Sequence, residues 1–269
     1  MPRALLVPLV LLLGLLPLAA QAQTYGLPTP QPRSTDPAAL RRVAREREVH
    51  ERFRRGLDAE ASGAWEAAAA EFRRVLALDP PEPKGSTARY DLALALAHTG
   101  HRAEAMDQLD EALRRDPGFA AAAANLTSLA LEAGDVPRAR AAADRFARIA
   151  PDAARARYAR GLAALRGGDL GVARSEFGAL LGSDPSYAVA HYDLGLVELR
   201  SGNVEAATAE LRRAVALAPG YARARFALAE ALIRGGRRDD AARELDRTLA
   251  DAADPTLRSL ASALRAGLR

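Results

Sequence analysis

A glycine recurs at a nearly fixed interval through most of the chain. The interval is 37 residues once and then 34 residues four times, and it links Gly63, Gly100, Gly134, Gly168, Gly202 and Gly236. An alanine follows each of these glycines by five residues, and a proline follows the first five by 17. Periods of about 20 to 50 residues are typical of solenoids, in which one small unit stacks on the next. The sequence therefore predicts about six copies of one short unit.

Each unit has the pattern of two antiparallel helices joined by a tight turn. About 14 residues with helical apolar spacing precede each glycine, and about 14 follow it. The glycine ends the first helix because the turn needs positive φ, and the proline ends the second because it cannot continue a helix. The residue after three of the glycines is a predicted N-cap of the second helix, namely Asp135, Asp169 and Asn203.

The composition agrees with closely packed helices. Among 269 residues, 64 are alanines and only 5% are aromatic, and alanine has the highest helix propensity. Small residues in the first helices are expected to face the alanines that follow the turns, so that the two backbones approach closely. They are Gly56, Ala93, Gly161, Gly195 and Ala229.

This pattern resembles the tetratricopeptide repeat family, whose unit is a helix–turn–helix of 34 residues. The best match combines Tyr192-Asp193-Leu194-Gly195 with Ala207, Leu211, Ala214 and Pro219. The resemblance implies an all-α fold, a right-handed α-solenoid of about six repeats over residues 49–254. The chain departs from the family at its early tryptophan position, which holds Arg52, Arg89, Ala123, Arg157, His191 and Arg225.

The two ends of the repeat region have their own patterns. Residues 37–48 form the Arg-rich start of the first helix. Residues 255–269 are predicted to form a C-terminal capping helix, with Asp254 as its N-cap and Pro255 in its first turn. Leu257, Ala261 and Leu264 fall on one stripe of this helix. A solenoid needs such an end because its last repeat otherwise leaves apolar surface in water.

The first residues predict export. Residues 1–22 combine one basic residue, an apolar run and an A-x-A site, which is the pattern of a secretory signal peptide cleaved after Ala22. Residues 23–36 are rich in proline and are predicted to be a flexible linker. The mature chain is therefore expected to be periplasmic or secreted, and without cysteine it is not a lipoprotein. The alternative is that residues 1–22 are not cleaved and stay in the membrane as an anchor. We expect no other contact of the chain with a membrane.

The residues that catalysis would need are missing from the sequence. The chain has no cysteine, which excludes disulfides, Cys-ligated metals and thiol nucleophiles. It also has no glycine-rich phosphate loop, no G-x-S-x-G and no H-E-x-x-H. His98 and His101 lie on either side of the Gly100 turn, so one helix face does not present both. We predict no enzyme activity, no catalytic residue, no bound metal and no small-molecule cofactor.

A binding surface remains, and the resemblance places it on the first helices, which line the concave face in this family. Aromatic and leucine side chains there are suited to anchor a peptide or a helix of a partner protein. The alternative is that these side chains only pack between adjacent repeats. The predicted groove residues are Phe53, Leu57, Tyr90, Leu94, Asn125, Tyr158, Leu162, Tyr192, Leu196 and Phe226.

The arginines at the start of the repeat region are a second candidate surface. Residues 33–55 hold eight arginines and four acids, while residues 56–269 hold 29 basic and 30 acidic residues. The net charge of +4 thus comes from one N-terminal segment and not from the repeats. A nucleic-acid partner is therefore not expected. Arg41, Arg45, Arg52 and Arg55 could contact an anionic surface or glycan, or they could pair with nearby glutamates.

These observations favour a non-catalytic protein-interaction scaffold in the bacterial periplasm or envelope, which binds a partner segment in its concave groove. The alternative is an accessory or glycan-binding module of an envelope biogenesis or secretion machine, which would use the Arg-rich helix. Binding of an anionic glycan should weaken steeply with ionic strength, whereas binding in an apolar groove should not.

Overall fold

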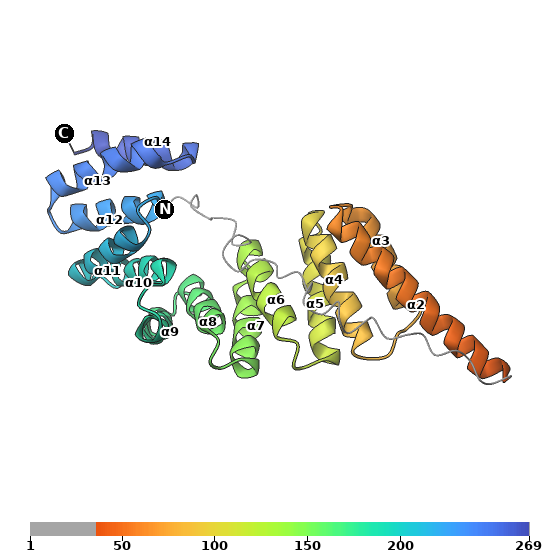
Figure 1. Ribbon diagram of the computed structural model, residues 1–269. Coiled ribbons are helices and arrows are strands. Elements are labelled where there is room, and N and C mark those ends of the chain that lie inside the picture. Colours follow the sequence, from red (N-terminus) through yellow and green to blue (C-terminus); the bar gives the residue numbers. More distant parts are fainter. Residues whose placement is uncertain (1–35, 269) are drawn as a thin grey trace. The chain divides into compact units, whose positions relative to one another are not determined.

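The computed structural model describes residues 36–268, which form helices and short loops only (Figure 1). The prediction of an all-α chain is confirmed for these residues. The predicted signal peptide and the linker up to residue 35 lie outside the described residues, as does residue 269. In residues 36–268, no helix is both long and apolar enough to cross a membrane. The described chain divides into an N-terminal unit, residues 36–149, and a C-terminal unit, residues 150–268.

The N-terminal unit contains three helix pairs. Within it, each helix packs against the one that follows it in the chain. Its helices are α2 (Pro37–Ala61), α3 (Trp65–Ala77), α4 (Lys84–His98), α5 (Arg102–Arg115), α6 (Ala120–Ala133) and α7 (Val136–Ile149).

The C-terminal unit contains three further pairs and one last helix. Here too, consecutive helices pack against each other. Its helices are α8 (Ala154–Arg166), α9 (Leu170–Ser183), α10 (Ala188–Arg200), α11 (Val204–Leu217), α12 (Ala222–Arg234), α13 (Arg238–Asp251) and α14 (Pro255–Ala266). Leu257 and Ala261 of α14 are buried in a cluster with Leu232 and Leu245, so α14 covers the last pair.

The periodic glycines make the turns that the sequence predicts. All six have φ between 73° and 84°, a left-handed conformation that side chains with a Cβ disfavour. Of the predicted N-caps, the Asp135 and Asp169 carboxylates accept hydrogen bonds from the Arg138 and Val172 amides. Asn203 differs, because its side chain makes no cap bond and its amide donates to Glu198 Oε2 at 2.7 Å.

The small residues of the first helices make room for different side chains from those that we expected. A Cβ added to Gly161 would lie 2.6 Å from the Phe177 ring, and one added to Gly195 would lie 2.6 Å from Leu211. Gly56 stands in the same relation to Phe72. The nearest atoms to these glycines thus belong to a large side chain and not to the alanines that we expected. Each glycine accommodates a large side chain of the second helix, which fills the space between the paired helices.

Candidate partner-binding surface

The aromatic side chains of the first helices pack against rings of the next repeat. The centroids of Tyr158 and Tyr187 are 5.7 Å apart, and those of Tyr192 and Tyr221 are 5.0 Å apart. In the N-terminal unit, Tyr90 lies 5.0 Å from Phe119. Each pair is separated by 29 residues, because the second ring belongs to the residue just before the next first helix. Such ring pairs add about 0.5–1.5 kcal/mol beyond area burial.

The hydroxyls of two of these tyrosines also bond to the next repeat. Tyr158 donates to Asp193 Oδ2 at 2.7 Å, and the Tyr90 hydroxyl oxygen accepts from Asn125 Nδ2 at 2.9 Å. Both pairs are 35 residues apart. Ring and hydroxyl of the same side chain thus join adjacent repeats.

The predicted groove residues therefore fall into two groups. Seven are at most 7% exposed, and for Tyr90 and Tyr158 the packing alternative is the one that the structure shows. These two are wrong as direct anchors for a partner, because their rings and hydroxyls are used between repeats. The buried group is Phe53, Tyr90, Leu94, Asn125, Tyr158, Leu162 and Phe226, and the partly exposed group is Leu57, Tyr192 and Leu196.

Two further tyrosines, which sequence reasoning missed, belong to the accessible surface. Tyr187 and Tyr221 are partly exposed, and each stands immediately before a first helix. Their spacing of 34 residues, with Phe119 at the same repeat position, is the signal that could have identified them. We call Tyr187, Tyr192, Leu196 and Tyr221 the tyrosine surface; it belongs to the C-terminal unit alone.

A buried carboxylate lies behind the tyrosine surface. Burial raises the pKa of Asp193 to about 7, although the hydrogen bond from Tyr158 and the charges of Arg166 and Arg200 act in the opposite direction. The pKa of Tyr192 and of Tyr221 is raised by burial first and by the charge of Asp193 second. The tyrosine surface is therefore aromatic, with a partly ionised acid close to it at neutral pH, and the charges of Arg223 and Glu230 also act on Tyr192.

The four arginines predicted as an anionic-surface site on α2 are not equivalent. Arg45 donates to the carbonyl oxygen of Leu78 at 2.5 Å. Arg52 donates to Glu48 Oε1 at 2.9 Å and lies 3.5 Å from Glu71 Oε2. Arg41 and Arg55 are exposed and have no ion pair with any of residues 36–268. Two of the four are thus used within the fold.

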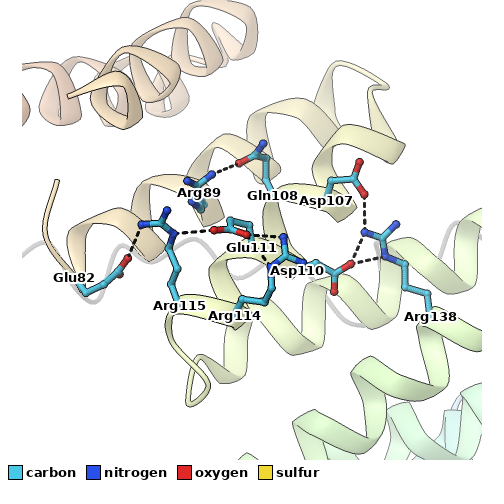
Figure 2. A network of polar contacts seen from close by, with 9 residues as sticks. All are labelled: Glu82, Arg89, Asp107, Gln108, Asp110, Glu111, Arg114, Arg115 and Arg138. Atoms are coloured by element: carbon cyan, nitrogen blue, oxygen red, sulfur yellow. Dashed lines mark hydrogen bonds and ion pairs between the residues drawn. The ribbon is translucent and has the colours of Figure 1, made fainter. Parts of the chain in front are cut away.

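A network of charged side chains joins α4, α5 and α7 with the loop before α4 (Figure 2). Arg115 bonds to Glu111 at 2.8 Å and lies 3.7 Å from Glu82. Arg138 donates to Asp107 and Asp110, both at 2.8 Å. Hydrogen bonds from Arg115 and Arg114 lower the pKa of Glu111 to about 2. Each acid in this network contacts an arginine, so the network holds the helices together and leaves no acid free to bind a ligand.

The described residues contain no cluster suited to metal binding: in 36–268, no three His, Asp or Glu side chains converge on a common point. His98 stacks on Trp65 at 3.8 Å between centroids, and His191 pairs with Glu210. Both ring nitrogens of His191 thus have partners within the fold, since Nε2 lies 3.0 Å from the carbonyl oxygen of Pro185.

Comparison with known proteins identifies one family. The sequence pattern of the tetratricopeptide repeat matches residues 53–120, 125–188, 158–222 and 198–264. No curated protein matches the chain.

Solved structures of low sequence identity share the fold. A tetratricopeptide repeat protein from Parabacteroides merdae is 16% identical, with a TM-score of 0.72 over 82% of this chain and 89% of that chain. The protein pilF of Pseudomonas aeruginosa is 16% identical, with a TM-score of 0.62 over 82% of this chain and 99% of that chain. YrrB, described as a TPR protein with an unusual peptide-binding site, is 16% identical, with a TM-score of 0.53 over 66% of this chain and 92% of that chain. At these identities the likeness shows an α-solenoid fold and nothing about partners.

Proposed function

Because the chain belongs to the tetratricopeptide repeat family, we propose that it is a non-catalytic scaffold of the bacterial envelope that holds a segment of a partner protein. The tyrosine surface carries this proposal. Its side chains are partly exposed and held in place by ring contacts of 5.0 Å and 5.7 Å between repeats. Rigid aromatic side chains beside a leucine are suited to anchor a peptide or helix, because they bury much area at little entropic cost.

A crosslinking experiment in cells tests this proposal. A photoreactive amino acid is placed at Tyr192 or Tyr221 of the tyrosine surface, and for comparison at Val172 or Leu217. The comparison positions are 38% and 44% exposed apolar side chains on α9 and α11. We expect one discrete protein adduct from the first pair of positions and none from the second. Adducts from the second pair alone would contradict the proposal.

An affinity measurement on the trapped partner supplies the energetic test. Tyr192→Ala and Tyr221→Ala should each weaken binding about tenfold or more, as expected for aromatic anchors. Leu217→Ala should leave the affinity unchanged. Binding through these side chains should vary little between 50 and 500 mM salt, whereas binding through the arginines of α2 would weaken steeply. A steep salt dependence with unaltered affinity of both tyrosine variants would favour the anionic-surface alternative.

The location in the envelope is also part of the proposal, and residues 1–22 support it by their signal-peptide pattern. Fractionation of cells that carry a C-terminally tagged chain should recover it with the periplasmic or secreted proteins. N-terminal sequencing should begin at Gln23. A full-length chain in the membrane fraction would show that the segment is kept as an anchor, and a cytoplasmic chain would contradict export.

A further inference from the structure

Three arginines stand in one column of the C-terminal unit. Arg166, Arg200 and Arg234 are the last residues of α8, α10 and α12, at intervals of 34 residues. We call them the arginine row. The N-terminal unit has no arginine at this repeat position, which holds Ala61, His98 and Glu132. The row therefore belongs to the same repeats as the tyrosine surface.

The arginine row lies beside the tyrosine surface, because both follow the same helix faces. On α10, Tyr192, Leu196 and Arg200 are four residues apart, a spacing that puts side chains in succession along one face of a helix. Burial raises the pKa of Asp193 between them, and the charges of Arg166 and Arg200 oppose this rise. A segment held by Tyr192 and Leu196 therefore passes within one helical turn of Arg200.

Hydrogen bonds to the preceding repeat position two of the three guanidinium groups. Arg200 Nη1 donates to the carbonyl oxygen of Leu165 at 3.1 Å, and Arg234 Nη1 donates to that of Leu199 at 3.1 Å. Leu165 and Leu199 directly precede Arg166 and Arg200, so the row runs without a gap from repeat to repeat. A guanidinium group has five N–H donors, and each of these bonds uses one. The Nε and Nη2 donors of Arg200 and Arg234 remain for a ligand.

The positive charge of the arginine row is open to solvent. Arg200 and Arg234 are exposed and Arg166 is partly exposed, and none of them forms an ion pair with an acid among residues 36–268. Exposed arginines elsewhere differ, as Arg213 does, which lies 2.7 Å from an acid of its own helix. The nearby acid Glu230 is partly buried, and burial raises its pKa although the charge of Arg234 lowers it. Fixed positive charge thus borders the tyrosine surface.

We propose that the partner segment on the tyrosine surface is acidic, with aspartate or glutamate side chains that bind the arginine row. This rests on the proposed function, and it adds the chemistry of the partner. A carboxylate accepts two parallel hydrogen bonds from one guanidinium group. One helical turn is about 5.4 Å, which an extended segment spans in about two residues. The segment therefore has an acid about two residues from its apolar or aromatic anchor.

A protein segment fits the two surfaces together better than other anions do. A glycan with acidic groups would meet the arginine row, but it offers no apolar side chain to Tyr192 and Leu196. A peptide supplies both kinds of group at a short spacing. The expected recognition is thus a pair of adjacent contacts, one apolar and one ionic, on the same helix face.

A peptide selection tests the proposal before the partner is known. Random peptides are displayed and selected on the purified chain, and the enriched peptides are synthesised. Each acidic residue is then replaced by its amide, asparagine for aspartate and glutamine for glutamate. We expect at least one such replacement to weaken binding about tenfold or more, as for a hydrogen bond to a charged group.

Variants of the chain locate this effect. In the triple variant Arg166→Gln, Arg200→Gln, Arg234→Gln, the acidic peptide and its amide should bind equally, and the binding that remains should vary little with salt. Arg212→Gln removes an exposed arginine of α11 and should keep the tenfold preference. Arg200→Glu should bind a peptide with lysine in place of the required acid severalfold more tightly than the wild type does. Loss of a merely structural arginine does not produce that gain.

The outcomes separate this inference from the proposed function. Enriched peptides without a required acid would overturn the inference alone, as would a preference for the acid that survives the triple variant. If the triple variant does not fold, absence of the gain with Arg200→Glu overturns it. Selection that enriches no peptide, or peptides that bind Tyr192→Ala and Tyr221→Ala as tightly as the wild type, would count against the proposed function itself.

Discussion

His191 Nδ1 lies 2.6 Å from Glu210 Oε2, and this contact joins the two helices of one repeat. The two residues are 19 positions apart, and the same separation recurs in other repeats. Arg52 meets Glu71 at 3.5 Å, Arg89 donates to Gln108 at 3.1 Å and Arg225 lies 3.7 Å from Glu244. The third repeat has alanine at both positions, Ala123 and Ala142. A polar pair thus stands where the family has its tryptophan.

The polar pair predicts a graded response to substitution at Glu210. Glu210→Ala leaves the buried His191 ring without this partner and should lower the free energy of unfolding by about 1–3 kcal/mol. Glu210→Gln keeps an acceptor, as Gln108 does opposite Arg89, and should cost less than half as much. Urea unfolding followed by circular dichroism measures both. Equal losses in the two variants would show that the hydrogen bond is not what matters.

The bond between Tyr158 and Asp193 predicts a loss of stability that depends on pH. Tyr158→Phe removes the hydroxyl from a buried acid and should cost about 1–3 kcal/mol. Because the pKa of Asp193 is about 7, the cost should be larger at pH 8, where the carboxylate is ionised, than at pH 5. Tyr90→Phe is the control, since its partner Asn125 does not titrate. A cost for Tyr158→Phe that is the same at both pH values would contradict the prediction.

Two glycines of the same helix pair should respond oppositely to alanine. A Cβ at Gly161 would lie 2.6 Å from Phe177, so Gly161→Ala should destabilise the fold by about 1–3 kcal/mol through overpacking. Gly178 lies within α9 and has no atom within 4 Å of the added carbon. Gly178→Ala should therefore stabilise by up to about 1 kcal/mol through helix propensity. Thermal unfolding of the two variants compares them directly, and a melting temperature raised in both would refute the packing argument.

Glu60 predicts that stability falls as pH rises through the weakly acidic range. Its pKa is about 7 in the folded chain and near 4.5 when unfolded, so the unfolded chain releases this proton first. Glu60 therefore contributes to the free energy of unfolding below pH 4.5, and this contribution is lost as the pH rises to 7. His98 acts in the opposite direction, because burial lowers its pKa, so the total slope mixes several groups.

Glu60→Gln isolates the contribution of this one group. The variant should gain stability relative to the wild type as pH rises from 5 to 8, measured by urea midpoints at four pH values. Asp58→Asn, which changes an exposed acid on the same helix, is expected to show a constant difference across the series. A constant difference in stability for Glu60→Gln as well would contradict a raised pKa of Glu60 in the folded chain.

Removal of residues 255–269 should expose the end of the repeat region. Leu257 and Ala261 are at most 2% exposed and share a cluster with Leu245. The truncated chain should melt at a lower temperature and associate in gel filtration, because its last helix pair presents apolar surface to water. Leu257→Ala is the milder test and should cost about 2–4 kcal/mol. A truncated chain that stays monomeric with unchanged melting would contradict this.

The repeat period was sufficient to predict the helices, because each turn depends on a local conformational need at one glycine. It did not predict which part of each first helix is accessible. Tyr158 and Tyr192 stand at one repeat position, yet the first is buried and the second is partly exposed. The two also differ in the residue 35 positions on, which is Asp193 in one case, where it accepts the Tyr158 hydroxyl, and Ala227 in the other. The glycines show a related point, since spacing does not tell which of several nearby side chains lies closest to a glycine.

The two contacts of Tyr158 differ in how they would survive the loss of a repeat. Deletion of residues 187–220 removes 34 residues and brings Tyr221 into the place of Tyr187, so the ring contact has a replacement. The same deletion brings Ala227 into the place of Asp193, so the hydroxyl has none. The ring contact therefore needs only an aromatic residue before the next first helix, whereas the hydrogen bond also needs a polar side chain at the position of Asp193. Asn125 meets that need for Tyr90, and Ala227 would not meet it for Tyr158.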